Sequence, residues 1–267
     1  GSLHLALPCM SCRLCLDGGE EKELLTPCAC RGSAGHVHAE CLLEWCDHVG
    51  EYKKCDVCHQ CFVGPAALLA ARHRFRRAEA LPEEDPEVLE ATYQVAQALA
   101  AEGKNAEAAK LFEYLHGIYC RKKGETHLDT LALASSWALS LHFLQRHEEA
   151  AELQEITLFS LRDKVGNSHT RCVTESNNLA LSLTALGRHE EAVPLLRMTV
   201  TARERDGTQT LEWITAANNL AGSLSQVGEL AESTEVFEKA IACSCRVLGE
   251  QHPLSLKAQT NLAVVLQ

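Results

Sequence analysis

Eight cysteine and histidine residues near the start of the chain fall into four pairs, and only one or two other residues separate the members of each pair. Thiolate and imidazole groups at this spacing suit tetrahedral zinc, because a tight turn presents both side chains to one ion. Four pairs therefore predict two zinc ions, although the spacing alone leaves open which pairs share an ion. The pairs are Cys12 and Cys15, Cys28 and Cys30, His38 and Cys41, and Cys55 and Cys58.

This segment resembles a RING-CH (RING-variant) domain over residues 9–63. The resemblance is carried by the ligand order with histidine fifth, by the single residue inside the second pair, and by the runs TPCACRGS at 26–33 and CLLEW at 41–45. A plant homeodomain finger shares the ligand order, but it usually has an aromatic residue two positions before its seventh ligand. This chain has Lys53 there, so we exclude that alternative.

The resemblance implies cross-braced pairing, in which the first and third pairs share one zinc ion and the second and fourth pairs share the other. A segment this short buries too little apolar surface to fold alone, so the metal is expected to supply much of the folding free energy. Protein ligands close both sites and leave no open position for a substrate, which excludes a metalloenzyme. The implied ligand sets are Cys12, Cys15, His38 and Cys41 for the first ion, and Cys28, Cys30, Cys55 and Cys58 for the second.

Three neighbouring residues are alternative ligands. Cys9 and Cys61 each stand at Cys-x2-Cys distance from a member of the set, but using either one breaks the spacing of the family. His36 is the third candidate, yet only His38 has two residues between itself and the next cysteine. We therefore expect none of the three to bind zinc.

In function, the resemblance implies a RING-type ubiquitin ligase, which forms no covalent intermediate with ubiquitin. Such a domain docks a ubiquitin-conjugating enzyme charged with ubiquitin and positions the thioester for attack by a substrate lysine. The resemblance places the docking contacts at Leu14, Trp45 and Val57; the alternatives are the domain core for Leu14 and Val57, and packing on the zinc loops for Trp45. Many RING domains carry a cation just after the last ligand, where this chain has His59. A non-catalytic adaptor therefore remains the alternative function.

The composition narrows the class of protein. The chain has 267 residues, enough for two domains, and 46% of them are hydrophobic, which is ordinary for a folded protein. Its net charge of -11 argues against a nucleic-acid partner. Seven of the 14 cysteines have zinc spacing and no signal peptide is visible, so we predict a reducing, cytoplasmic location. No apolar run approaches the ~20 residues of a spanning helix, so we expect no membrane span.

The elements that follow the zinc segment form a repeat. A large residue followed by alanine recurs every 41 or 42 residues, and each unit reads as two amphipathic helices joined at a loop. In the third unit these helices are predicted over 173–186 and 189–205, with the small residues Ala180 and Ala192 where the helices cross. The recurring pairs are Val95-Ala96, Trp137-Ala138, Leu179-Ala180, Leu220-Ala221 and Leu262-Ala263.

The repeats resemble the tetratricopeptide repeats of kinesin light chain, including His252-Pro253 shortly after the loop residue Gly249. The predicted fold is mostly α: a small cross-braced two-zinc RING-variant domain, then an α-solenoid of 42-residue helix hairpins. We place the RING-CH domain at 9–63, a basic helix and an acidic proline-flanked linker at 64–86, and the array at 87–267, with four full repeats and one half repeat. Because the array stops within a unit, we expect either that the natural chain continues or that another surface covers this end.

The first helices of successive units are expected to line a concave face on which side-chain amides form a ladder. An amide both donates and accepts hydrogen bonds, so the ladder could bind the backbone of a protein or peptide substrate. The alternative is hydrogen bonding between helices that fixes the stack. The ladder residues are Asn177, Asn178, Asn218, Asn219 and Asn261.

Overall fold

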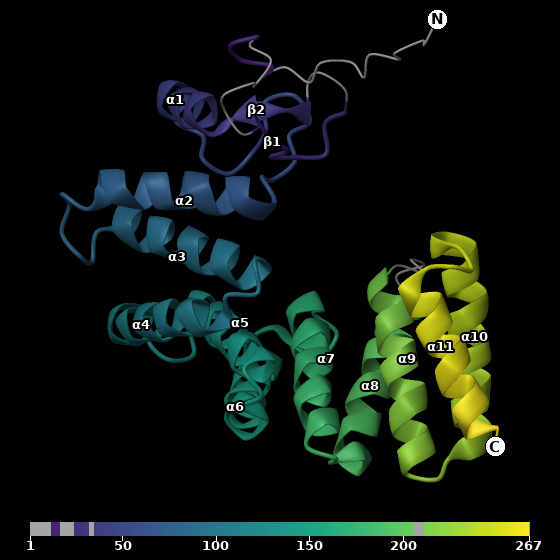
Figure 1. Cartoon of the computed structure of the whole chain (residues 1–267). Coiled ribbons are helices and arrows are strands. Elements are labelled where there is room, and N and C mark those ends of the chain that lie inside the picture. Colours follow the sequence, from purple (N-terminus) through teal and green to yellow (C-terminus); the bar gives the residue numbers. More distant parts are fainter. Residues whose placement is uncertain (1–11, 17–23, 32–34, 206–210, 267) are drawn as a thin grey trace, which may run out of the picture. The chain divides into compact units, whose positions relative to one another are not determined.

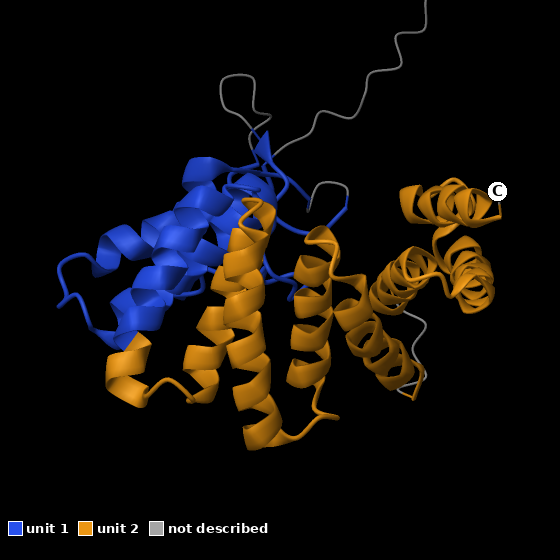
Figure 2. Ribbon diagram, turned by 90° about the horizontal axis from the view of Figure 1, so that it is seen from below, with its two compact units in different colours: residues 1–118 blue, residues 119–267 orange. Residues whose placement is uncertain are grey.

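The computed structural model describes residues 12–16, 24–31, 35–205 and 211–266 (Figure 1). The chain divides into two compact units, residues 1–118 and 119–267 (Figure 2), which are described separately. In the described ranges, no helix is both long enough and apolar enough to cross a membrane. The elements in chain order are β1 (Leu24–Leu25), β2 (Val37–His38), α1 (Ala39–Val49), α2 (Gly64–Ala78), α3 (Pro86–Ala101), α4 (Asn105–Lys123), α5 (Leu128–Phe143), α6 (His147–Val165), α7 (Thr170–Ala185), α8 (His189–Arg205), α9 (Leu211–Gln226), α10 (Leu230–Leu248) and α11 (Pro253–Val265).

The cysteine-rich segment of the first unit has little regular structure. The short strands β1 and β2 pair antiparallel, and α1 follows β2 directly. The apolar core of this segment is small, with Val37, Leu42 and Phe62 buried together with several cysteines. So small a core leaves much of the folding free energy to be supplied by another interaction.

The helix α2 packs against α1 and along α3. It begins with proline in its first turn, where the missing backbone N–H costs nothing. Ala66 and Ala70 on α2 are buried in the core of the cysteine-rich segment. Segment 64–86, predicted as a basic helix and an acidic linker, thus contributes side chains to that core as well as a helix beside α3.

In the second unit, each helix from α5 to α11 packs against the next one along the chain. The hairpin of α7 and α8 confirms the two helices predicted for the third repeat. Ala180 and Ala192 are fully buried, as expected for residues at a close crossing of helices. The loop between the two helices contains Gly187 with φ +75°, and the equivalent loop of the preceding repeat contains Gln145 with φ +63°. A left-handed conformation costs a non-glycine residue roughly 1–2 kcal/mol, so packing of the hairpin must offset this cost.

Histidines that recur in the second loop of each repeat cap the following helix. The Nδ1 atom of His127 accepts a hydrogen bond from the backbone N–H of Asp129 at 3.2 Å, and His169 does the same for Arg171 at 3.1 Å. His252 caps α11 in this way at 3.2 Å. Each cap satisfies one of the N–H groups that have no partner within the helix. The recurrence therefore has a structural cause and needs no binding site.

Candidate metal centre and interaction surfaces

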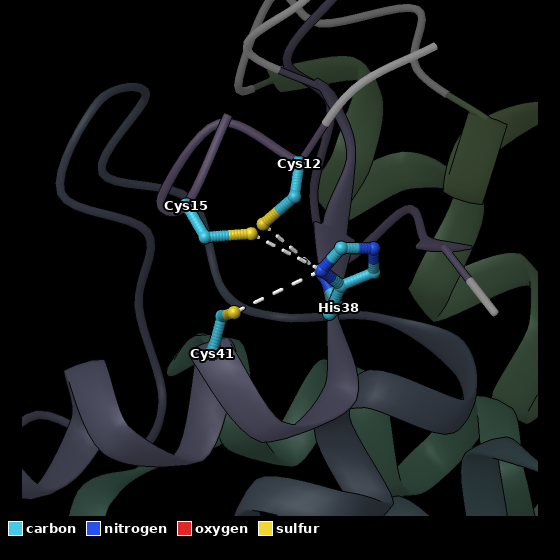
Figure 3. A group of neighbouring side chains, drawn as sticks. All are labelled: Cys12, Cys15, His38 and Cys41. Atoms are coloured by element: carbon cyan, nitrogen blue, oxygen red, sulfur yellow. Dashed lines mark hydrogen bonds between the residues drawn. The ribbon is translucent and has the colours of Figure 1, made fainter. Parts of the chain in front are cut away.

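The first and third ligand pairs meet in one cluster. Cys12 and Cys15 lie on a turn, His38 ends β2, and Cys41 lies in the first turn of α1. The Sγ atom of Cys15 is 3.3 Å from Nδ1 of His38, and that of Cys41 is 3.8 Å from the same nitrogen. Figure 3 shows the three sulfurs and the imidazole converging on one point. The four ligand atoms lie within 4.8 Å of one another.

The second and fourth pairs form an equivalent cluster. The ligand atoms of Cys28, Cys30, Cys55 and Cys58 also lie within 4.8 Å of one another, and the sulfurs of Cys30 and Cys55 are 3.8 Å apart. Tetrahedral zinc with Zn–S bonds of about 2.3 Å places its sulfurs about 3.8 Å apart. Both clusters fit zinc, and the structure pairs the ligands in the cross-braced way that the resemblance implied.

Arg13 connects the two clusters. It lies inside the first pair, but its Nη1 donates to Sγ of Cys55 at 3.4 Å and its Nη2 is 3.0 Å from Oδ1 of Asp56. Burial would raise the pKa of Cys55, but backbone N–H donors from Cys58 and Val57 and the Arg13 guanidinium lower it to about 6. Sequence reasoning missed Arg13, because its partners lie more than 40 residues away and no spacing rule connects them.

Other thiols in the clusters resist ionisation. Hydrogen bonding to Cys28, followed by burial, raises the pKa of Cys30 to about 12. Burial, followed by the neighbouring Cys15, raises the pKa of Cys41 to about 12. Thiolates this close together repel one another unless a cation lies between them. A zinc ion supplies that charge, so metal binding and deprotonation of these thiols are coupled.

The alternative ligands lie outside both clusters where they are described. Cys61 is exposed and forms a backbone bridge with Lys54, and the carbonyl of His36 accepts a hydrogen bond from the backbone N–H of Arg13. Neither residue belongs to a group of ligand atoms that could hold an ion. Cys9 lies outside the described residues.

Comparison with known proteins agrees with this geometry. Residues 12–61 match the model of the RING-variant domain. The cysteine-rich segment is a RING-variant domain. It is 40% identical over 58 residues to E3 ubiquitin-protein ligase MARCHF9 of Homo sapiens, and this match covers 22% of this chain and 16% of that protein. It is also 43% identical over 47 residues to E3 ubiquitin-protein ligase MARCHF11 of Homo sapiens, and this match covers 18% of this chain and 11% of that protein. The matches thus span only a small part of these relatives.

The helices match a different set of proteins. Residues 176–205 and 213–254 match the model of a tetratricopeptide repeat. A structure of putative kinesin light chain repeats from Podosopora anserina has a TM-score of 0.60 and 24% identity, and the match covers 69% of this chain and 88% of that one. The structure of BtubC from P. vanneervenii has a TM-score of 0.60 and 21% identity, over 74% and 81% of the two chains. Identities this low show the fold, a tetratricopeptide solenoid, and not the ligand.

The three residues expected to dock a conjugating enzyme are accessible on the RING-variant domain. Leu14 is 36% exposed and Val57 is 56% exposed, so neither is a core residue. Trp45 on α1 is half-buried, with its ring centroid 6.2 Å from that of Phe62 in an edge-on contact. Trp45 therefore packs against the core and remains partly accessible. His59, after the last ligand, is exposed with φ +55°.

The side chains of the amide ladder in the second unit are only partly accessible to a binding partner. Asn218 is buried, whereas the other four members are half-buried. Among the described residues, several of these amides have polar atoms that are shielded from solvent and have no hydrogen-bond partner. Such atoms favour a bound partner, because an unsatisfied buried amide is costly. They are Oδ1 of Asn177, both polar atoms of the Asn218 side chain, and Nδ2 of Asn219.

Polar side chains beside the ladder join adjacent helices. Ser135 on α5 donates to the carboxylate of Glu175 on α7, and Nδ1 of His142 lies 3.2 Å from the hydroxyl of Ser182. Burial raises the pKa of Glu175 to about 7, although its hydrogen bonds with Ser135 and Asn178 oppose the rise. Hydrogen bonding between helices is thus present along this face, as the alternative interpretation of the ladder expected.

Proposed function

We propose that the chain is a RING-type ubiquitin ligase whose RING-variant domain docks a charged ubiquitin-conjugating enzyme and whose repeats recruit the protein to be modified. The observation that carries the proposal is the pair of zinc-binding turns joined by Arg13 and Asp56, with the exposed apolar side chains of Leu14 and Val57 next to these two residues. The side chain of Trp45 on α1 adds an aromatic contact. The ligase relatives matched by this domain support the same conclusion.

The proposed chemistry is positioning. The thiols of both clusters are metal ligands, so none needs to carry ubiquitin. A rigid platform can hold the thioester of the carrier in a reactive geometry, and orientation alone supplies large rate gains. Exposed apolar and aromatic side chains on a small rigid domain are the usual hot spots of such an interface. Outside the membrane in a reducing compartment, such as the cytoplasm, the clusters would keep their thiols reduced and metal-bound.

The second candidate is a non-catalytic adaptor, in which the zinc domain only binds proteins. His59 favours it, because many RING domains have a guanidinium or ammonium group in that position. A panel of conjugating enzymes separates the two candidates. Complete absence of ubiquitin discharge across the panel, from protein with two zinc ions per chain, would leave the adaptor as the function.

The docking surface is tested by three single substitutions: Leu14→Ala, Trp45→Ala and Val57→Ala. We expect Trp45→Ala to slow ubiquitin discharge from the carrier by about thirtyfold or more, as for an interface hot spot, and the other two to slow it less. Val49→Ala, which removes another exposed apolar side chain from α1, is the matched control and should change little. Zinc content is measured for each variant. Loss of zinc from Trp45→Ala would make Trp45 a structural residue instead.

A further inference from the structure

A groove of about 560 Å³ lies between the RING-variant domain and the hairpin formed by α2 and α3. Phe62 and Val63 line it from the C-terminal end of the RING-variant domain, Ala71 lines it from α2, and Ala98 and Ala101 line it from α3. All these residues belong to the first compact unit. None of the roles proposed above uses this groove.

The residues of α3 that line the groove lie on the part of the ladder face that the first repeat contributes. Gln94 and Ala101 stand two repeat periods before Asn178 and Ala185, so they occupy equivalent positions on their helices. The helix α2 packs along α3 as α6 packs along α7, and it therefore acts as the second helix of a preceding repeat. The RING-variant domain packs on α2 (Figure 1). Residues within its segment 52–63 supply the groove wall that the first helix of such a repeat would supply.

The groove walls are mostly apolar, and the polar side chains among the lining residues are those of Tyr52, Lys53, Gln94 and Gln97. Phe62 and the alanines offer apolar surface, and the small alanine side chains leave room for a larger one. In Gln94, Nε2 donates to Oε1 of Glu90 at 3.1 Å, but Oε1 is shielded from solvent and accepts no hydrogen bond from the residues that the structure describes. A shielded carbonyl oxygen is best satisfied by an N–H donor. An extended peptide offers both a backbone N–H and an apolar side chain.

The groove walls are held together by a polar contact between α1 and α2. Both carboxylate oxygens of Asp47 on α1 lie 3.0 Å from Nε2 of His73, and Oδ1 lies 2.5 Å from Nη1 of Arg77, both on α2. The hydroxyl of Tyr52, which also lines the groove, donates to the same carboxylate at 2.7 Å. A preformed groove loses less conformational entropy on binding.

We propose that this groove binds an apolar side chain of an extended substrate peptide, and that Oε1 of Gln94 accepts a backbone N–H of that peptide. The proposal rests on the proposed role of the repeats as a substrate receptor. It adds that the RING-variant domain is part of the receptor, so that a segment of the substrate is held against the domain that docks the carrier of ubiquitin.

A phage-displayed library of random peptides, selected on the zinc-loaded full chain, provides the probe. The affinity of a synthetic peptide of the selected consensus is then measured by fluorescence anisotropy. We expect the consensus to contain an apolar residue. Ala101→Trp fills the groove and should weaken binding at least about tenfold, and Gln94→Leu, which removes the acceptor, should weaken it about tenfold. The matched control is Ala185→Trp, at the equivalent exposed position of the third repeat, and should change affinity less than about twofold.

Several results would overturn the proposal. One is that no peptide is enriched on the wild-type chain over Ala101→Trp, and another is that the selected peptide binds Ala101→Trp as well as it binds the wild type. Equal weakening by Ala101→Trp and Ala185→Trp would place the peptide elsewhere, and dimerisation lost in Ala101→Trp would make a second copy the occupant. Ubiquitin discharge without peptide is measured on the same variants, so that a failure of the groove proposal can be distinguished from a failure of the ligase proposal. If the chain binds the peptide in this groove but discharges no ubiquitin, the result supports the peptide-binding groove and contradicts the proposed ligase function.

Discussion

The RING-variant domain and the repeats of the second unit reach a defined structure in opposite ways. In the residues that the structure describes, the RING-variant domain has two strands of two residues, one helix of 11 residues and a small core in which cysteines are prominent. The second unit has a large core to which the helices from α5 to α10 contribute apolar residues. Stability in the first region is therefore concentrated in eight ligands, whereas in the second it is spread over many similar contacts. Substitutions in the two regions should therefore differ in how much they change stability and in how far their structural effects extend.

The largest effect is expected from a zinc ligand. Cys28→Ser removes a ligand of the second cluster, and because Arg13 and the shared core join the clusters, we expect the whole RING-variant domain to unfold. A structural zinc site is worth on the order of 10 kcal/mol of folding free energy. The helices of the second unit should keep their protection. Elemental analysis and hydrogen exchange measure the two regions separately.

Cys61→Ser is the matched control for this experiment. Cys61 is an exposed cysteine of the same domain that belongs to neither cluster, so two zinc ions per chain should remain. If Cys28→Ser instead kept both ions and the protection of α1, the domain would not depend on its metal, and the contrast between the two regions would disappear.

The two regions also differed in what their sequences could predict. Ligand spacing predicted both clusters, because zinc demands particular side chains and a turn fixes the distance within each pair. It could not predict Arg13, whose contacts depend on how distant turns meet. The repeat period predicted the α7–α8 hairpin, but it placed the start of α7 at residue 173 rather than Thr170. The start is set by His169, whose capping role follows from backbone geometry that hydrophobic periodicity does not contain.

An intermediate effect is expected from overpacking one crossing in the second unit. Ala180 is fully buried between helices, and Ala180→Leu should destabilise the fold by about 1–3 kcal/mol, since the surrounding side chains must move. Ala185→Leu, on an exposed position of the same helix, should change stability by less than about 0.5 kcal/mol. Urea unfolding followed by far-UV circular dichroism measures both, with zinc content unchanged. Equal effects would mean that the small residue at the crossing has no packing role.

The smallest effect concerns Glu175, a charged exception in the distributed core of the second unit. Burial raises its pKa from an ordinary 4.5 to about 7, so the folded state binds the proton more tightly than the unfolded state. The resulting stability is fully present below pH 4.5 and is lost as the pH rises through about 7. Between about pH 6 and pH 8, the wild type should therefore lose about 1 kcal/mol more stability than Glu175→Gln, whose amide does not titrate.

The comparison of Glu175→Gln with the wild type isolates this carboxyl group, because the other titrating groups are common to both chains. His142 is one of them: burial and the neighbouring His147 lower its pKa, and its effect cancels in the difference. Urea unfolding midpoints across this pH range give the difference directly. Parallel pH profiles would mean that Glu175 is solvated like a surface carboxylate. Diverging profiles would show that one buried carboxyl group can dominate the pH response of a region whose core is mostly apolar.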